Sequence, residues 1–223
     1  MPNRDHKLSI HHLRRNYSYG SLVHSDLPKE PMPLFQEWFA HLQESELPEW
    51  FETNAMTLST TDGQGRVSSR IVLLKQLEPD GFVFFTNYDS AKGADIATNS
   101  YVAIHFFWPA FDRQVRIEGH AFKTTTAVSD QYFASRPRSS QLGAAASPQS
   151  QVIQNESELE RVIEELDKRY EGQPVPRPAH WGGYKVVPQI VEFWQGKPSR
   201  LHDRYRYRLN ESDRSWTLER LAP

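Results

Sequence analysis

The pattern of apolar and polar positions divides the chain into a polar N-terminal stretch, an early helix, a long region of short strands, and a second helical region before the last strands. Residues 1–30 are polar, so we expect them to form a flexible segment. Residues 33–42 carry an apolar stripe at helical spacing, which predicts a helix packed on a core. The stripe consists of Leu34, Phe35, Trp38, Phe39 and Leu42.

From residue 55 the pattern changes to short apolar or alternating runs separated by Gly, Pro, Asn and Asp, which is typical of strands. The run 67–75 is apolar on both faces at its centre, which predicts a central strand covered on both sides. Strands at such short intervals favour an antiparallel barrel over a doubly wound sheet. The predicted strands cover residues 55–61, 67–75, 82–86, 101–108, 115–123, 184–194, 200–209 and 215–221.

Helical patterns interrupt the strands. We expect a short helix that ends near residue 99, and helices over 126–135 and 156–170, with 142–150 as a loop. A connector rich in Pro and Gly follows at 172–180 and does not mark a domain boundary. The fold class is therefore mainly β with flanking helices (α+β), as one domain over residues 31–223 behind the segment 1–30.

Composition excludes several classes of protein. The chain has 26 basic and 28 acidic residues, so neither a nucleic acid nor a membrane surface is an expected partner. Cysteine is absent, and the nine histidines are scattered without carboxylates at ligand spacing, so no metal site is expected. No signal peptide or membrane-spanning run is visible, which predicts a cytoplasmic protein.

Candidate anion-binding side chains recur in several segments. Strand alternation would place Arg200, His202 and Arg204 on one face, as a surface that holds an anion and handles a proton. A solvated strand face is the alternative, and this stretch alone does not decide between them. Arg70 and Lys75 bracket one strand about 16 Å apart, at about 3.3 Å per residue, and could reach two ends of a long anion. Their odd spacing points them to opposite faces, so this needs a twist, a bulge or a second subunit, and the alternative is that both charges reach solvent.

A second cluster has the composition of a phosphate clamp. Tyr132, Arg136 and Ser140 recur every four residues, so a helical path would bring one guanidinium and two hydroxyls to one side. Pro137 makes an unbroken helix unfavourable, unless it lies in the first turn of a new helix. Lys92, at a strand-to-helix junction, is a weaker phosphate candidate. Together these segments favour a small phosphorylated ligand.

Several segments, taken together and in order, carry a family resemblance. They are Arg70-Ile-Val-Leu-Leu-Lys75, Phe85-Thr-Asn87, Tyr132-Phe-Ala-Ser-Arg136-Pro-Arg-Ser-Ser140-Gln141, Gln149-Ser150, Trp181-Gly-Gly183, Glu192-Phe-Trp-Gln-Gly196 and Arg200-Leu-His-Asp-Arg204. In these segments the chain resembles the pyridoxine (pyridoxamine) 5′-phosphate oxidases, from His12-Leu-Arg-Arg-Asn-Tyr17 to the terminal Arg220-Leu-Ala-Pro223.

The resemblance implies an antiparallel Greek-key split β-barrel that binds FMN at the interface of a homodimer. The cofactor residues that it implies are Arg70, Ile71, Val72, Leu73, Leu74, Lys75, Phe85, Thr86, Lys92, Gln114, Gln149, Ser150, Trp194 and Arg204. The substrate residues that it implies are Arg14, Arg15, Asn16, Tyr17, Lys75, Tyr132, Arg136, Ser140, Arg200, Leu201 and His202, with 14–17 as a lid. Arg200 and His202 would be catalytic.

The implied reaction oxidises pyridoxamine or pyridoxine 5′-phosphate to pyridoxal 5′-phosphate, with O2 as acceptor and release of H2O2, and of ammonia from the amine. One position departs from the family: Ala91 precedes Lys92 where relatives often have Arg, which bears on FMN affinity rather than on the reaction. The alternatives are a flavin reductase-like split barrel with another substrate, and a vitamin-phosphate or single-stranded nucleic acid binding protein without catalysis.

Overall fold

The computed structural model describes residues 10–223, so the expectation of a flexible segment over residues 1–9 lies outside the described residues. The helices are α1 (Pro31–Glu44), α2 (Ala91–Thr98), α3 (Thr126–Ser135), α4 (Arg138–Ala146) and α5 (Glu156–Arg169), with short 3₁₀ turns η1 (His24–Asp26), η2 (Pro109–Phe111) and η3 (Pro198–Arg200). The strands are β1 (Ala55–Thr61), β2 (Val67–Leu73), β3 (Gln76–Glu78), β4 (Gly81–Asn87), β5 (Tyr101–Trp108), β6 (Arg113–Lys123), β7 (Trp181–Gln195), β8 (Asp203–Leu209) and β9 (Trp216–Leu221).

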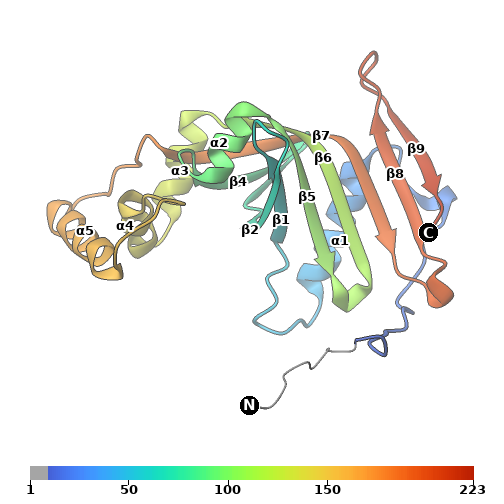
Figure 1. Ribbon diagram of the computed structural model, residues 1–223. Helices are drawn as coiled ribbons and strands as arrows, with labels where there is room; N and C mark the ends of the chain where they lie inside the picture. The colour runs from blue at the N-terminus through green and yellow to red at the C-terminus, as the bar shows by residue number, and fades with distance from the viewer. Residues whose placement is uncertain (1–9) are drawn as a thin grey trace.

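The strands form one antiparallel sheet that curls into a half-barrel (Figure 1), which confirms the predicted fold class. The order is β2-β1-β5-β6-β7-β4-β3, and β8 pairs with β7 and then with β9. Strand β7 is shared between two parts of the sheet, because its first half pairs with β4 and its second half with β8. Helices α3 to α5 lie at one end of the molecule, and β8 and β9 at the other.

The early helix forms as its apolar stripe predicts. Phe35 on α1 is fully buried, with its ring centroid 4.9 Å from that of Phe82 on β4 and 5.1 Å from that of Phe106 on β5. Trp38 lies edge-on to Phe193 on β7 at 5.2 Å. The helix therefore closes the concave side of the sheet with aromatic packing.

A second, smaller core forms between α3, α4 and the start of β7. Its buried members are Phe133, Leu142, Val175 and Trp181. The predicted loop 142–150 is wrong in its first half, because α4 continues to Ala146. The run of alanines that looked like a loop is a good helix former once Leu142 is buried.

Two strand predictions also need correction. The run 67–75 was expected to be a central strand, but β2 ends at Leu73 and lies at one end of the sheet order, with Val67 69% and Ile71 63% exposed. The strand predicted from residue 200 begins at Asp203. Arg200 belongs to η3 and has a positive φ of 60°, so strand alternation does not place it. Within residues 10–223, no helix has the length and apolar character needed to cross a membrane.

Replacing Phe35 with Ala should lower the free energy of unfolding by about 3–5 kcal/mol, because it leaves a cavity between α1, β4 and β5. Urea denaturation followed by tryptophan fluorescence measures the change. Val152→Ala is the matched control, because Val152 is 99% exposed. A loss for Phe35→Ala no larger than that of the control would contradict the packing described for α1.

Candidate functional site

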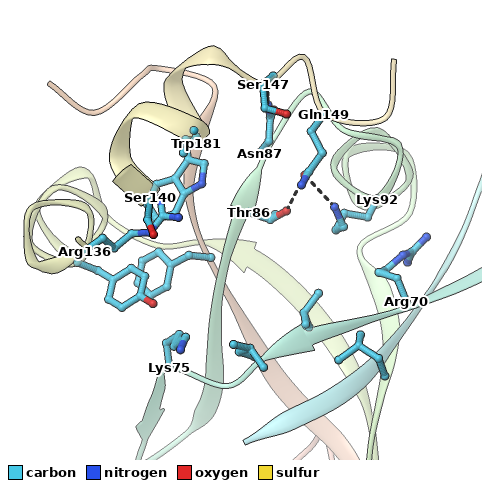
Figure 2. A pocket seen from close by; sticks show the side chains of 17 residues that line it. Arg70, Lys75, Thr86, Asn87, Lys92, Arg136, Ser140, Ser147, Gln149 and Trp181 are labelled. Atoms are coloured by element: carbon cyan, nitrogen blue, oxygen red, sulfur yellow. Dashed lines mark hydrogen bonds between the residues drawn. The ribbon is translucent and has the colours of Figure 1, made fainter. Parts of the chain in front are cut away.

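A cavity of about 680 Å³ lies where β2, β4, α3 and α4 meet (Figure 2). Four cationic side chains line it, and none of its lining residues within the described chain is a carboxylate. The excess of positive charge makes the cavity electrostatically favourable for an anion. The predicted site residues that line it are Arg70, Ile71, Val72, Leu73, Lys75, Phe85, Thr86, Lys92, Tyr132, Arg136, Ser140 and Gln149.

An internal polar network orients Arg70 at the edge of this cavity. Its Nη1 donates to Thr60 Oγ1 at 2.7 Å and to the Leu58 carbonyl at 3.2 Å. The buried Thr60 hydroxyl in turn donates to Asp95 at 2.6 Å, and this carboxylate lies 3.9 Å from Arg70. Burial lowers the pKa of the Arg70 guanidinium, and Asp95 opposes this effect. The guanidinium is therefore held in place by groups outside the cavity.

Lys92 and Gln149 form a second polar group on the same side of the cavity. Gln149 Oε1 accepts from Lys92 Nζ at 3.0 Å and from Thr86 Oγ1 at 3.3 Å (Figure 2). Lys92 also donates to Ser90, the N-cap of α2, at 3.2 Å. Burial lowers the pKa of the Lys92 ammonium, and the nearby Arg70 lowers it further. An anion bound between Lys92 and Arg70 would relieve their mutual repulsion.

The predicted clamp of Tyr132, Arg136 and Ser140 is brought together on the opposite wall. Tyr132 lies on α3, Arg136 is its C-cap, and Ser140 lies on α4, which begins after Pro137 as the sequence allowed. The Arg136 guanidinium lies 4.7 Å from the ring centroid of Trp181. Its Nη1 is buried and has no hydrogen-bond partner within residues 10–223.

An unpaired buried guanidinium nitrogen is costly, because it has lost its hydrogen bonds to water without gaining a replacement. Burial lowers the pKa of the Arg136 guanidinium, and the nearby Tyr132 partly opposes this effect by raising it. The aromatic ring of Tyr132 stacks on that of Phe85 at a centroid distance of 3.9 Å. This stacking holds the Tyr132 side chain in place within the clamp. Trp181 belongs to the same stack, and the sequence did not single it out as a site residue.

Three other predicted cofactor residues lie in a separate pocket of about 450 Å³. Gln114, Trp194 and Arg204 line it together with Glu192 and Arg116. The buried Glu192 accepts from Arg204 at 2.7 Å and from Arg116 at 2.8 Å. It holds Arg204 toward the pocket. Its role was missed because one Glu in a strand gives no signal until its partners are known.

His202 lies beside this second pocket. Its ring centroid is 4.6 Å from that of Trp194 and 5.4 Å from that of Tyr17. The Lys197 N–H donates to His202 Nδ1 at 3.1 Å, so the neutral ring carries its hydrogen on Nε2. Burial lowers the pKa of His202 below 6.5, and Arg200 lowers it further. Near neutral pH, His202 is an uncharged donor through Nε2.

The remaining predicted residues are placed as follows. Arg14, Asn16 and Leu201 are exposed, and Leu74 is buried in the core with 6% exposure. Ser150 is exposed, with a φ of 72°, next to Gln149. Arg15 lies 2.9 Å from the buried Asp112. Within residues 10–223, no three His, Asp or Glu side chains gather in a way that could hold a metal ion.

Comparison with protein families gives matches over most of the chain. Residues 44–170 match a family described as "Pyridoxamine 5'-phosphate oxidase", and residues 181–223 match "Pyridoxine 5'-phosphate oxidase C-terminal dimerisation region". A protein of Paraburkholderia phytofirmans named pyridoxine/pyridoxamine 5'-phosphate oxidase is 49% identical, over 96% of this chain and 99% of its own length. One of the same name from Pseudomonas fluorescens SBW25 is 50% identical, over 95% and 97%.

Solved structures with the same fold agree with these matches. PhzG from Burkholderia lata 383, in complex with tetrahydrophenazine-1-carboxylic acid, has a TM-score of 0.83 and 28% identity, and the match covers 89% of this chain and 95% of that one. A Nostoc punctiforme protein described as related to pyridoxamine 5'-phosphate oxidase and FMN-binding has a TM-score of 0.69 at 17% identity, over 88% and 100% of the chains. The second likeness shows the fold alone.

Replacing Arg200 with Met should raise the pKa of His202, because one cause of its lowering is the Arg200 charge. In the pH interval between the two values, the wild-type ring is neutral and the variant ring is protonated. An NMR titration of the His202 ring protons measures both values. Arg161→Met, which removes an exposed charge on α5, is the control and should leave the titration unchanged. An equal or lower pKa in Arg200→Met would contradict the assigned cause.

Proposed function

Because the chain belongs to the pyridoxine/pyridoxamine 5′-phosphate oxidase family, we propose that it oxidises pyridoxamine and pyridoxine 5′-phosphate to pyridoxal 5′-phosphate with FMN as its cofactor. The observation that carries the proposal is the pairing of two anion sites in one cavity. Arg70 and Lys92 form one, and the clamp around Arg136 forms the other. FMN and the substrate each carry a phosphate and must be held in contact for a hydride to pass between them, so each phosphate needs its own binding site in the same cavity.

The residues present fit FMN at the first of these sites. Arg70 and Lys92 would hold its phosphate, since both are partly buried and no carboxylate lines the described cavity wall. The polar side chains of Thr86 and Gln149, which are hydrogen-bonded to each other, would form further hydrogen bonds to FMN near this phosphate. When bound, FMN supplies the redox chemistry, taking a hydride from the C4′ carbon of the substrate and passing the electrons to O2, with release of H2O2.

The substrate phosphate would bind to the clamp. Arg136 would supply its guanidinium charge, and the Tyr132 and Ser140 hydroxyls would supply two donors. Lys75, two residues beyond the end of β2, would add a second positive charge. Arg200 and His202 would hold the reacting end of the substrate. His202 would donate a hydrogen bond from Nε2 to the substrate. After oxidation of the amine substrate, water would add to the oxidised carbon and supply the aldehyde oxygen, and the nitrogen would leave as ammonia.

We propose that the enzyme works as a homodimer with FMN between its subunits. Two observations support this. The expected cofactor residues of one chain divide between two separate pockets, one with Arg70 and one with Arg204, which fits one FMN held by residues from two chains. Strand β2 at the sheet edge also exposes Val67 and Ile71, an apolar edge that a second chain would cover. A cytoplasmic location stays a prediction.

The test of this function is to purify the protein, record its visible spectrum, and assay pyridoxal phosphate and peroxide with pyridoxamine 5′-phosphate. A yellow protein with flavin absorbance that produces both is the expected result. A yellow protein that is inert toward this substrate would reject the substrate and leave a flavoprotein of other specificity. A colourless protein that neither binds added FMN nor reacts would reject the cofactor as well.

Replacing Arg136 with Met should raise the KM for pyridoxamine 5′-phosphate by about tenfold to a hundredfold, because one charge-assisted hydrogen bond is lost. FMN binding, measured by flavin fluorescence quenching, should be unchanged. Arg169→Met is the matched control, because it removes one positive charge at an exposed position at the end of α5. If the KM stays at the wild-type value, or FMN binding falls by a similar factor, the division of the cavity into two anion sites is wrong.

Replacing Ala91 with Arg should lower the Kd for FMN by about tenfold, since it adds one cation beside Lys92 at the first turn of α2. Ala97→Arg makes the same change of charge on the same helix, about 9 Å further along it at about 1.5 Å per residue, and should have little effect. Titration of the apoprotein with FMN compares the three. Equal affinities in Ala91→Arg and Ala97→Arg would show that Ala91 does not face the phosphate site.

A further inference from the structure

The turn between β5 and β6 contains a buried carboxylate that the proposed reaction does not use. Asp112 is 3% exposed and has a left-handed backbone with φ of 53°, a conformation that Asp tolerates. Its Oδ2 accepts from the backbone N–H groups of Ser18 at 3.1 Å and Tyr19 at 3.4 Å. Its Oδ1 lies 2.9 Å from Arg15 Nη2. Within residues 10–223, every polar partner of this side chain comes from the N-terminal segment.

The same segment is seated on the turn that follows β7. A Cβ at Gly196 would lie 2.8 Å from Tyr17 Cγ and 2.9 Å from Asp112 Cβ, so the absence of a side chain there lets both residues approach. The Tyr17 ring meets Trp194 edge-on at 5.5 Å and His202 at 5.4 Å. Tyr17 therefore contacts the histidine that we assign to the substrate, and its position depends on how this segment is held.

A second buried carboxylate holds the far end of the segment. Asp203 is 1% exposed, and its Oδ2 accepts from the Leu22 N–H at 3.0 Å. Residues 15–22, which we call the strap, are thus fastened at both ends, with Tyr17 near the first fastening. The Asp203 side chain also contacts Lys197 and Arg220, whereas within residues 10–223 the Asp112 side chain has polar contacts to the strap alone.

We infer that Asp112 is a positioning residue that fastens the strap and so sets Tyr17 against His202, and that Arg15 serves this fastening rather than the substrate. The inference rests on the proposed function for its kinetic consequence. A buried carboxylate is tolerated only when it is paired or hydrogen-bonded, and here the strap supplies both. Release of the strap would expose Asp112 to water, so the ion pair with Arg15 biases the strap toward the closed state.

Asp112→Asn separates the charge from the shape of the side chain. Asn also tolerates a positive φ and keeps an oxygen that can accept from the strap, but it loses the ion pair with Arg15. Arg15→Met removes the other partner at a position that is half exposed, so it should fold even if Asp112→Asn does not. Arg161→Met is the control, because it removes another exposed arginine from an ion pair, on α5.

Hydrogen exchange of the holoprotein, resolved at the Ser18 and Tyr19 amides by mass spectrometry with fragmentation, tests the fastening without any assay of activity. We expect exchange about tenfold faster in Asp112→Asn and in Arg15→Met, and about the same tenfold in the double variant, since both remove one interaction. An exchange rate equal to that of the wild type in either single variant would overturn the inference that Asp112 and Arg15 fasten the strap. So would effects on the rate that multiply in the double variant.

Kinetics with pyridoxamine 5′-phosphate then test the consequence. Each single variant should raise the KM by about tenfold with the flavin spectrum unchanged, and the double variant should raise it no further. If the two effects on KM multiply, Arg15 acts on the substrate by itself and the assignment is wrong. A wild-type protein that does not oxidise this substrate would refute the proposed function, while the exchange result would still decide the fastening.

Discussion

The pairing of β6 with β7 is the interaction on which the rest of the structure depends. Their ladder runs from Arg113 opposite Gln195 to Lys123 opposite Tyr184, with a shift of register at Glu118 and Gly119. A Cβ at Gly119 would lie 2.1 Å from the Val187 carbonyl oxygen, so only glycine lets the strands stay together through this bulge. On its other edge, β7 pairs with β4 from Trp181 to Val186 and with β8 from Ile190 to Gln195.

The two candidate pockets follow from this arrangement. Trp181 begins β7 and lines the cationic cavity, whereas Trp194 lies near the end of the same strand and lines the second pocket. The two pockets differ in whether a carboxylate lies beside their cationic side chains. In the second pocket, Glu192 pairs with both Arg116 and Arg204. In the first, Arg136 Nη1 is buried and has no hydrogen-bond partner within residues 10–223. The first cavity is therefore positively charged, with four cations and no carboxylate among its described lining residues, whereas the second pocket contains a carboxylate between its two arginines.

Local patterns predicted those parts of the fold and site whose contacts lie close in sequence. The stripe on α1 and the spacing of Tyr132, Arg136 and Ser140 were sufficient, because helical geometry relates residues four apart. The prediction of a central strand over 67–75 was wrong. Apolar residues on both faces of a strand indicate that both faces can be buried, but they do not tell whether the same chain or a second one buries them. Arg200 was misplaced because Ser199 and Arg200 both have a positive φ, which no periodicity reveals. The role of Glu192 was invisible for another reason, namely that both of its partners are distant in sequence.

The elements assigned to cofactor and substrate also differ in how firmly the fold holds them. The network of Arg70, Thr60 and Asp95 is anchored in strands and in α2, which suits a cofactor that stays bound through many turnovers. His202 and Tyr17 instead belong to an irregular turn and to the strap, which a few hydrogen bonds and one ion pair hold. A substrate must enter and its product must leave, so the wall that contacts it has to open at low cost. The division between rigid strands and a fastened strap therefore matches the division between a resident cofactor and an exchanging substrate.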